Sequence, residues 1–166
     1  LGARHTLLLL PGSFKRSGAC NLAARRATGE ILVFLDDAVE VMSPTWIEDM
    51  LGHVQRPEVG IVGPKLLFPD GHIHQAGVVF GGPQGVVHPF ALMHARTPHY
   101  FKTAHLIRNC SAVSGECQMV MRETFIRLGG YDESYEHGYG DLDLCLRARA
   151  EGLLVVYNPT ASFLLH

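Results

Sequence analysis

Short apolar runs along the chain predict strands that alternate with helices. Residues 31–35 are five consecutive apolar residues, which is typical of a strand buried on both faces. The apolar residues 7–10 predict an earlier strand, and helix formers fill residues 19–28 between the two runs. The order strand, helix, strand favours a parallel sheet, because parallel neighbours need a long crossover connection.

The alternation continues after the strand at residues 31–35. Ser43-Pro44 is typical of a helix start, and apolar residues recur at helical spacing over Trp46–Val54. Arg56-Pro57 then ends the predicted helix. Residues 59–62 predict a third short strand.

Glycine and proline divide residues 63–108 into hairpin-sized pieces. We predict antiparallel edge strands at residues 65–68 and 77–80, with Asp70-Gly71 turning the chain between them. Residues 88–105 form a long polar loop that carries several histidines. Loops of this length are usually lids or partner-binding segments, or are disordered.

The last third of the chain returns to alternating elements. We predict a strand within residues 111–121 and helices at residues 122–128 and 141–151. Two final strands are expected at residues 153–157 and 161–165.

Composition limits the class of protein. The chain has 166 residues, of which 47% are hydrophobic and 18% charged, so we expect one globular domain. The net charge of -2 gives no basic footprint, and nucleic acid is excluded as the main partner. The four cysteines lack C-x-x-C spacing and predict buried thiols in a reducing compartment, with two disulfides as the minority interpretation. The apolar run at residues 6–11 is too short to span a bilayer, so we predict a cytoplasmic protein.

Two adjacent carboxylates, Asp36 and Asp37, follow the apolar run at residues 31–35 directly. In open α/β sheets ligands lie outside the carboxyl ends of the strands, where acids hold a metal, bind a ribose or act as acid and base. The alternative is an acidic turn that only ends the strand.

A third acid, Asp141, stands with two glycines at the start of a predicted helix. Free backbone N–H groups and the helix dipole favour a carboxylate at such a position. Asp141 is therefore either the N-cap of the helix or a catalytic base. Asp143 and Arg147 are four residues apart and can pair along one face of the helix.

The motifs taken together resemble the inverting family 2 glycosyltransferases of the GT-A fold, and within them the rhamnosyltransferase-like and O-antigen-type members. The resemblance covers nearly all of the chain, in the family's order. It rests on these stretches: NLAA (21–24) with TGEILVFLDDAVEV (28–41), VGIVGPKL (59–66), DGHIHQAG (70–77), AVSGEC (112–117), LGGYDE (128–133), GDLDLCLR (140–147) and NPTASFLLH (158–166).

The resemblance implies a GT-A-like, Rossmann-like and mostly parallel sheet flanked by helices, with an antiparallel acceptor-side portion. Its D-x-D motif falls on Asp36, Asp37 and position 38, and implies that the two acids bind a nucleoside diphosphate sugar. A divalent Mn or Mg ion is expected from the family, with Asp37 and the late histidine His166 as its ligands here. Ala38 replaces the second motif aspartate, however, and a methyl group cannot ligate a metal.

For catalysis, the resemblance implies that Asp141 is the base that activates a hydroxyl of a glycan or lipid-linked acceptor. Ser114 and Gly115 would form the acceptor floor, and the loop at residues 88–105 could close over it. A lipid-linked acceptor would place the protein at the inner face of the membrane.

The resemblance also implies a domain organisation. Residues 1–166 would be one GT-A-like domain, with residues 1–62 as its sheet part and residues 63–166 as its acceptor and catalytic part. About 70 to 90 further residues of the nucleotide-binding start are expected before Leu7, from the usual size of such a unit. Without them the domain is partial, and an exposed sheet edge could form a homo-oligomer.

Three rival hypotheses stay open at this stage. A catalytically degenerate domain that binds a glycan or a protein is favoured by Ala38. A haloacid-dehalogenase-type phosphohydrolase would also need an acid at position 38 and downstream partners that the chain lacks. A zinc site at His72-x-His74 lacks further ligands at suitable spacing, so an exposed turn is preferred there.

Overall fold

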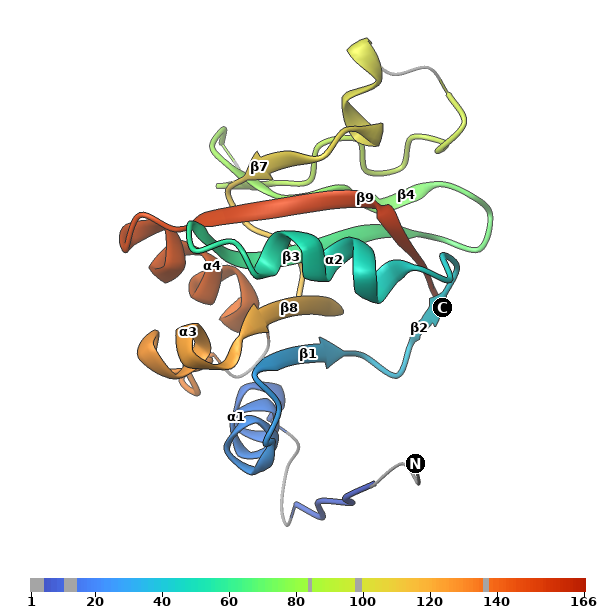
Figure 1. Cartoon of the computed structure of the whole chain (residues 1–166). Coiled ribbons are helices and arrows are strands. Elements are labelled where there is room, and N and C mark those ends of the chain that lie inside the picture. Colours follow the sequence, from blue (N-terminus) through green and yellow to red (C-terminus); the bar gives the residue numbers. More distant parts are fainter. Residues whose placement is uncertain (1–4, 11–14, 84, 98–99, 136–137) are drawn as a thin grey trace.

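The computed structural model describes residues 5–10, 15–83, 85–97, 100–135 and 138–166 (Figure 1). A seven-stranded sheet runs through it in the order β1-β8-β3-β9-β2, with β4 paired to β3 and β7 paired to β9. The sheet strands are β1 (Ile31–Leu35), β2 (Val39–Val41), β3 (Val59–Leu67), β4 (Ile73–Gln75), β7 (Arg108–Cys110), β8 (Cys117–Met121) and β9 (Leu154–Leu165). A separate two-stranded ribbon pairs β5 (Val79–Phe80) with β6 (Val86–Val87).

Helices cover both faces of this sheet. They are α1 (Arg16–Arg26), α2 (Trp46–Val54), α3 (Arg122–Arg127), α4 (Gly140–Ala150) and the 3-10 helix η1 (Tyr100–His105). The apolar face of α2, with Met50 and Val54 fully buried, packs on one face of the sheet, and α4 lies behind the sheet in the view of Figure 1. The opposite core combines Phe34 of β1 with Phe125 of α3 and Leu144 of α4. The α/β class with flanking helices is therefore confirmed.

The sheet is mixed rather than mostly parallel. Among the described strand pairs, only β3 and β9 run parallel, and a long crossover connects them. The predicted parallel strand, helix, strand unit does not form, because residues 7–10 are not a strand, and β1 pairs antiparallel with β8. Among the described strands, β8 alone pairs with β1, which leaves β1 at one edge of the sheet. Pairing of that edge with a second copy stays a prediction.

Two further predictions for the first third of the chain are wrong. Residues 7–10 have no regular structure, and the side chains of Leu7 and Leu9 are 83% and 84% exposed. β1 is buried on one face only, because Val33 and Leu35 point outward and are exposed. The first helix begins at Arg16 rather than at residue 19, which changes the residues that reach the site.

The glycine-rich middle of the chain turns where predicted but pairs differently. Gly71, with φ of 85°, closes the turn by donating its N–H to the Phe68 carbonyl. The strand after this turn is β4, and the predicted strand at residues 77–80 instead contributes β5. The two predicted final strands are one continuous strand, β9. Within the described residues, no helix has the length and apolar character needed to cross a membrane.

A buried amide joins α1 to the turn before the functional site. Asn21 donates to the Tyr131 carbonyl at 2.8 Å and to Glu133 Oε1 at 2.9 Å, and it accepts the Tyr131 N–H at 2.9 Å. Gly130, with φ of 73°, leaves no room for a side chain, since a Cβ there would lie 2.6 Å from Asn21 Oδ1.

We expect Asn21→Ala to lower the free energy of unfolding by about 1–3 kcal/mol, because it leaves the buried Tyr131 N–H and carbonyl without partners. Urea denaturation followed by circular dichroism measures this change. Asn109→Ala, which removes an exposed amide from β7, is the matched control and should change stability by less than about 0.5 kcal/mol. Equal effects of the two substitutions would contradict the role of Asn21.

Candidate active site

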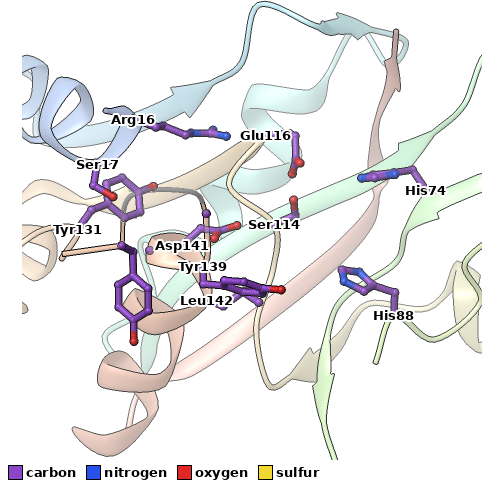
Figure 2. A pocket seen from close by; sticks show the side chains of 13 residues that line it. Arg16, Ser17, His74, His88, Ser114, Glu116, Tyr131, Tyr139, Asp141 and Leu142 are labelled. Carbon is purple, nitrogen blue, oxygen red and sulfur yellow. The ribbon is translucent and has the colours of Figure 1, made fainter. Parts of the chain in front are cut away.

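A cavity of about 360 Å³ opens where α1, β4 and the start of α4 converge (Figure 2). Its lining is mainly polar or aromatic and comes from segments far apart in the sequence: Arg16, Ser17, His74, His88, Ser114, Glu116, Tyr131, Tyr135, Tyr139 and Asp141. Hydroxyl-rich ligands suit such a lining, since carboxylates accept hydrogen bonds from hydroxyls and aromatic rings cover apolar ring faces.

Asp141 is the second residue of α4 and lines the cavity. The residue at the N-cap is Tyr139, in the left-handed region with φ of 69°, and it makes no side-chain cap hydrogen bond. The Asp141 carboxylate instead accepts the Gly115 N–H at 2.6 Å. Asp141 is therefore not the N-cap of its helix, and its carboxylate is held at the cavity by a segment outside the helix.

Asp141 can approach Gly115 this closely because Gly115 has no side chain. A Cβ at position 115 would lie 2.9 Å from Asp141 Cβ and 3.1 Å from Asp141 Oδ2. Its neighbour Ser114 is buried and also lines the cavity. The two residues expected to form the acceptor floor thus lie beside Asp141.

Arg16 connects the strand-end acid to the same segment. Its guanidinium lies 3.2 Å from Asp36 Oδ2 and donates to the Gly115 carbonyl at 2.5 Å. The Asp36 N–H in turn donates to the Glu116 carbonyl at 2.9 Å. Asp36 and Asp141 therefore stand at the two ends of one polar network, although Asp36 itself does not line the cavity.

Asp37 and His166 are brought near one turn but not into a ligand set. The His166 N–H donates to the Ala38 carbonyl at 2.9 Å, which places the end of β9 beside the Asp-Asp-Ala turn. The His166 ring lies 2.8 Å from Glu40 Oε2, and Asp37 is exposed. Within the described residues, no three His, Cys, Asp or Glu side chains are grouped to hold a metal ion. The residues present do not fit the divalent ion that the resemblance implies.

Glu116 and His74 form the opposite wall of the cavity. Glu116 Oε2 is buried and has no hydrogen-bond partner among the described residues. Burial lowers the pKa of the His74 imidazole. The nearby Glu116 raises this pKa in part, and the nearby His88 lowers it further. His74 packs edge-on against the Phe68 ring with centroids 5.0 Å apart. These contacts account for His74 without zinc, and the nearby His72 pairs with Asp70 at 3.1 Å.

Three tyrosines complete the lining. Tyr131 is buried and donates its hydroxyl to Gln118 Oε1 at 2.8 Å, and burial raises its pKa well above the ordinary value. Tyr135 and Tyr139 are 40% and 63% exposed, so their rings are open to a ligand. Tyr131 is part of the packed core beneath the cavity, whereas the exposed rings of Tyr135 and Tyr139 can stack on a sugar.

The sequence missed Arg16, Ser17 and Glu116. Arg16 and Ser17 lie before the helix predicted at residues 19–28. Glu116 lies within the quoted AVSGEC stretch, where an acid next to Ser114 and Gly115 was a usable signal. The expected pairing of Asp143 with Arg147 is confirmed at 2.7 Å.

Comparison with known proteins identifies the class. The model of glycosyl transferase family 2 matches residues 4–129, and the chain belongs to this family. Two solved glycosyltransferase structures share the fold: GalNAc-T7 with UDP, GalNAc and Mn2+ (TM-score 0.65, 16% identity, 91% of this chain and 30% of that chain) and the Pyrobaculum calidifontis mannosyltransferase PcManGT with GDP-Man and Mn2+ (TM-score 0.60, 21% identity, 96% and 38%). The GT-A-like fold is thereby confirmed.

Among curated relatives, the O-antigen biosynthesis protein RfbC of Myxococcus xanthus is 40% identical over 88% of this chain. The N-acetylglucosaminyl-diphospho-decaprenol L-rhamnosyltransferase of Mycobacterium tuberculosis is 32% identical over 80% of it. The chain spans 12% of the first relative's length and 48% of the second's.

The contact of Gly115 with Asp141 predicts that Gly115→Ala lowers the free energy of unfolding by about 1–3 kcal/mol, because the methyl group overlaps Asp141. Gly52→Ala is the control: a Cβ there meets nothing within 4 Å, and alanine in the helix should stabilise by about 0.5–1 kcal/mol. Opposite signs in urea denaturation support the close approach at Gly115. A neutral Gly115→Ala would contradict it.

Proposed function

We propose that the chain is the catalytic part of an inverting glycosyltransferase that uses a nucleoside diphosphate sugar. The acceptor is a hydroxyl of a glycan or a lipid-linked glycan, as the names of the curated relatives suggest for those proteins. The observation that carries the proposal is the placement of Asp141: its carboxylate lines the cavity and is aimed there by the Gly115 N–H.

The reaction is one displacement at the anomeric carbon. The acceptor hydroxyl bonds to that carbon while the bond to the diphosphate oxygen breaks, and Asp141 takes the hydroxyl proton. The electron pair of the broken bond leaves with the nucleoside diphosphate. Because attack and departure occur on opposite faces, the sugar in the product has the inverted anomeric configuration.

The other lining residues bind and orient in this proposal. Ser114, Gly115 and Glu116 form the floor under the acceptor, where Glu116 Oε2 can accept a sugar hydroxyl. Tyr135 and Tyr139 stack on the apolar face of a sugar ring. Asp36 and Asp37 lie on the donor side, beyond Arg16. His88 lines the cavity at the start of the segment that was expected to be a long loop, residues 88–105, of which residues 100–105 form η1. In this proposal the segment is the one that closes over the acceptor.

A second candidate is a glycan-binding domain that has lost the transfer chemistry. It is favoured by Ala38 and by the engagement of Asp36 with Arg16, since both alter the donor side. The cavity would then bind the acceptor glycan alone. For either candidate we propose a cytoplasmic location at the inner face of the membrane, where lipid-linked acceptors are found.

Asp141→Asn in the full-length protein tests the base. We expect kcat for sugar transfer to fall about 10²- to 10⁴-fold, because the amide cannot take the proton, while acceptor binding stays nearly unchanged. Transfer is followed by release of nucleoside diphosphate, and the anomeric configuration of the product by NMR.

Asp143→Asn is the matched control, since it makes the same chemical change on the same helix in a side chain that pairs with Arg147. It should retain kcat within about tenfold. Near-normal transfer by Asp141→Asn would overturn the base assignment. A wild-type protein that binds glycan but transfers no sugar would favour the second candidate.

A further inference from the structure

The Asp-Asp-Ala turn uses its own polar atoms internally. Asp36 Oδ1 accepts the Ala38 N–H at 3.2 Å, and the Ala38 carbonyl accepts the His166 N–H at 2.9 Å. Position 38 offers only a methyl group where the family motif has a carboxylate. Divalent ions such as Mn²⁺ or Mg²⁺ bind through oxygen ligands, often one or two carboxylates together with substrate phosphates. Here the Asp36 carboxylate is already engaged by the Ala38 N–H and by Arg16.

The nearest histidine does not make up the difference. The His166 ring lies 2.8 Å from Glu40 Oε2, in a contact between the end of β9 and β2. Both side chains are more than half exposed and lie outside the cavity lining.

The cation beside Asp36 in this structure is the side chain of Arg16. The Arg16 guanidinium lies 3.2 Å from Asp36 Oδ2, donates to the Gly115 carbonyl and lines the cavity. Burial alone would lower the pKa of Arg16, but the carboxylates Asp36 and Glu116 raise it overall, so the group stays charged. Figure 2 shows the guanidinium reaching toward Glu116 and Asp141 from α1.

We propose that Arg16 replaces the divalent ion in this protein as the resident cation between Asp36 at the end of β1 and the segment at residues 114–116. This inference rests on the proposed function, because it concerns how the same site binds the diphosphate of the sugar donor. A guanidinium carries five N–H donors, more than the contacts with Asp36 and Gly115 use, and its planar fork suits phosphate oxygens. The protein would therefore bind its donor without Mn²⁺ or Mg²⁺.

Arg16 also acts as a positioning residue. It holds Asp36 through one nitrogen and the Gly115 carbonyl through another, and the Gly115 N–H holds Asp141. A metal ion at Asp36 would compete with the guanidinium for the same carboxylate and would be repelled by its positive charge. The two cations therefore exclude each other at this position.

Binding of Mn²⁺ alone, followed by loss of the EPR signal of the free ion, tests the proposal without any activity. We expect the wild-type chain to bind no Mn²⁺ up to about 1 mM, the weak end of protein cation sites. Arg16→Ala combined with Ala38→Asp removes the guanidinium and restores the second carboxylate. This double variant should bind Mn²⁺ with a dissociation constant about tenfold or more below that limit.

The matched control combines Arg26→Ala with Ala38→Asp, because Arg26 is an exposed arginine on the same helix. It keeps Arg16 and should bind Mn²⁺ at least about tenfold more weakly than the Arg16 double variant. Arg16→Lys, which keeps a positive charge, should bind none. Thermal melts followed by circular dichroism show that each variant is folded.

Wild-type binding of Mn²⁺ below about 1 mM would overturn the proposal. Equal binding by the two double variants, or none by either, would show that Arg16 is not what excludes the ion. These outcomes are independent of the base test, since Asp141→Asn can abolish transfer whether or not a metal binds.

Discussion

The site depends on the two backbone hydrogen bonds of one residue, Gly115. The Gly115 carbonyl accepts a hydrogen bond from Arg16, and the Gly115 N–H donates to Asp141. Through Arg16 the first contact extends to Asp36 at the end of β1. The segment around Gly115, which directly precedes β8, therefore joins the edge of the sheet to the start of α4. A glycine is required there because any side chain would displace Asp141.

The charges around this segment do not cancel. Asp36, Glu116 and Asp141 are three carboxylates around one guanidinium, and His74 has its pKa lowered by burial, so it adds little positive charge near neutral pH. Such a cavity suits neutral, hydroxyl-rich molecules better than anions, which is consistent with an acceptor sugar between Asp141 and the tyrosines. The anionic part of a donor is better placed toward Arg16.

Patterns along the sequence predicted the chemistry of the site better than its construction. Asp141 stood out as a glycine-flanked acid at a helix start, which is a local signal, whereas Ser114 and Gly115 were expected only from the resemblance to the family. Arg16 was not predicted, since its partners lie far along the chain and only the earlier start of α1 brings it to Glu116 and Asp36. The prediction of a mostly parallel sheet was wrong for the same reason. Hydrophobicity marks residues 31–35 as a strand, but the direction in which β1 pairs is decided by its distant partner β8. Residues 7–10 are apolar enough for a strand, yet no described strand pairs with them.

The most direct measurement is a crystal structure of the protein with an acceptor glycan and a nucleoside diphosphate bound in the presence of Mn²⁺. The account predicts an acceptor hydroxyl about 2.6–3.2 Å from the Asp141 carboxylate, with Arg16 still on Asp36 and Gly115. An acceptor bound away from Asp141, or a Mn²⁺ ion on Asp36 with Arg16 turned out of the site, would contradict it.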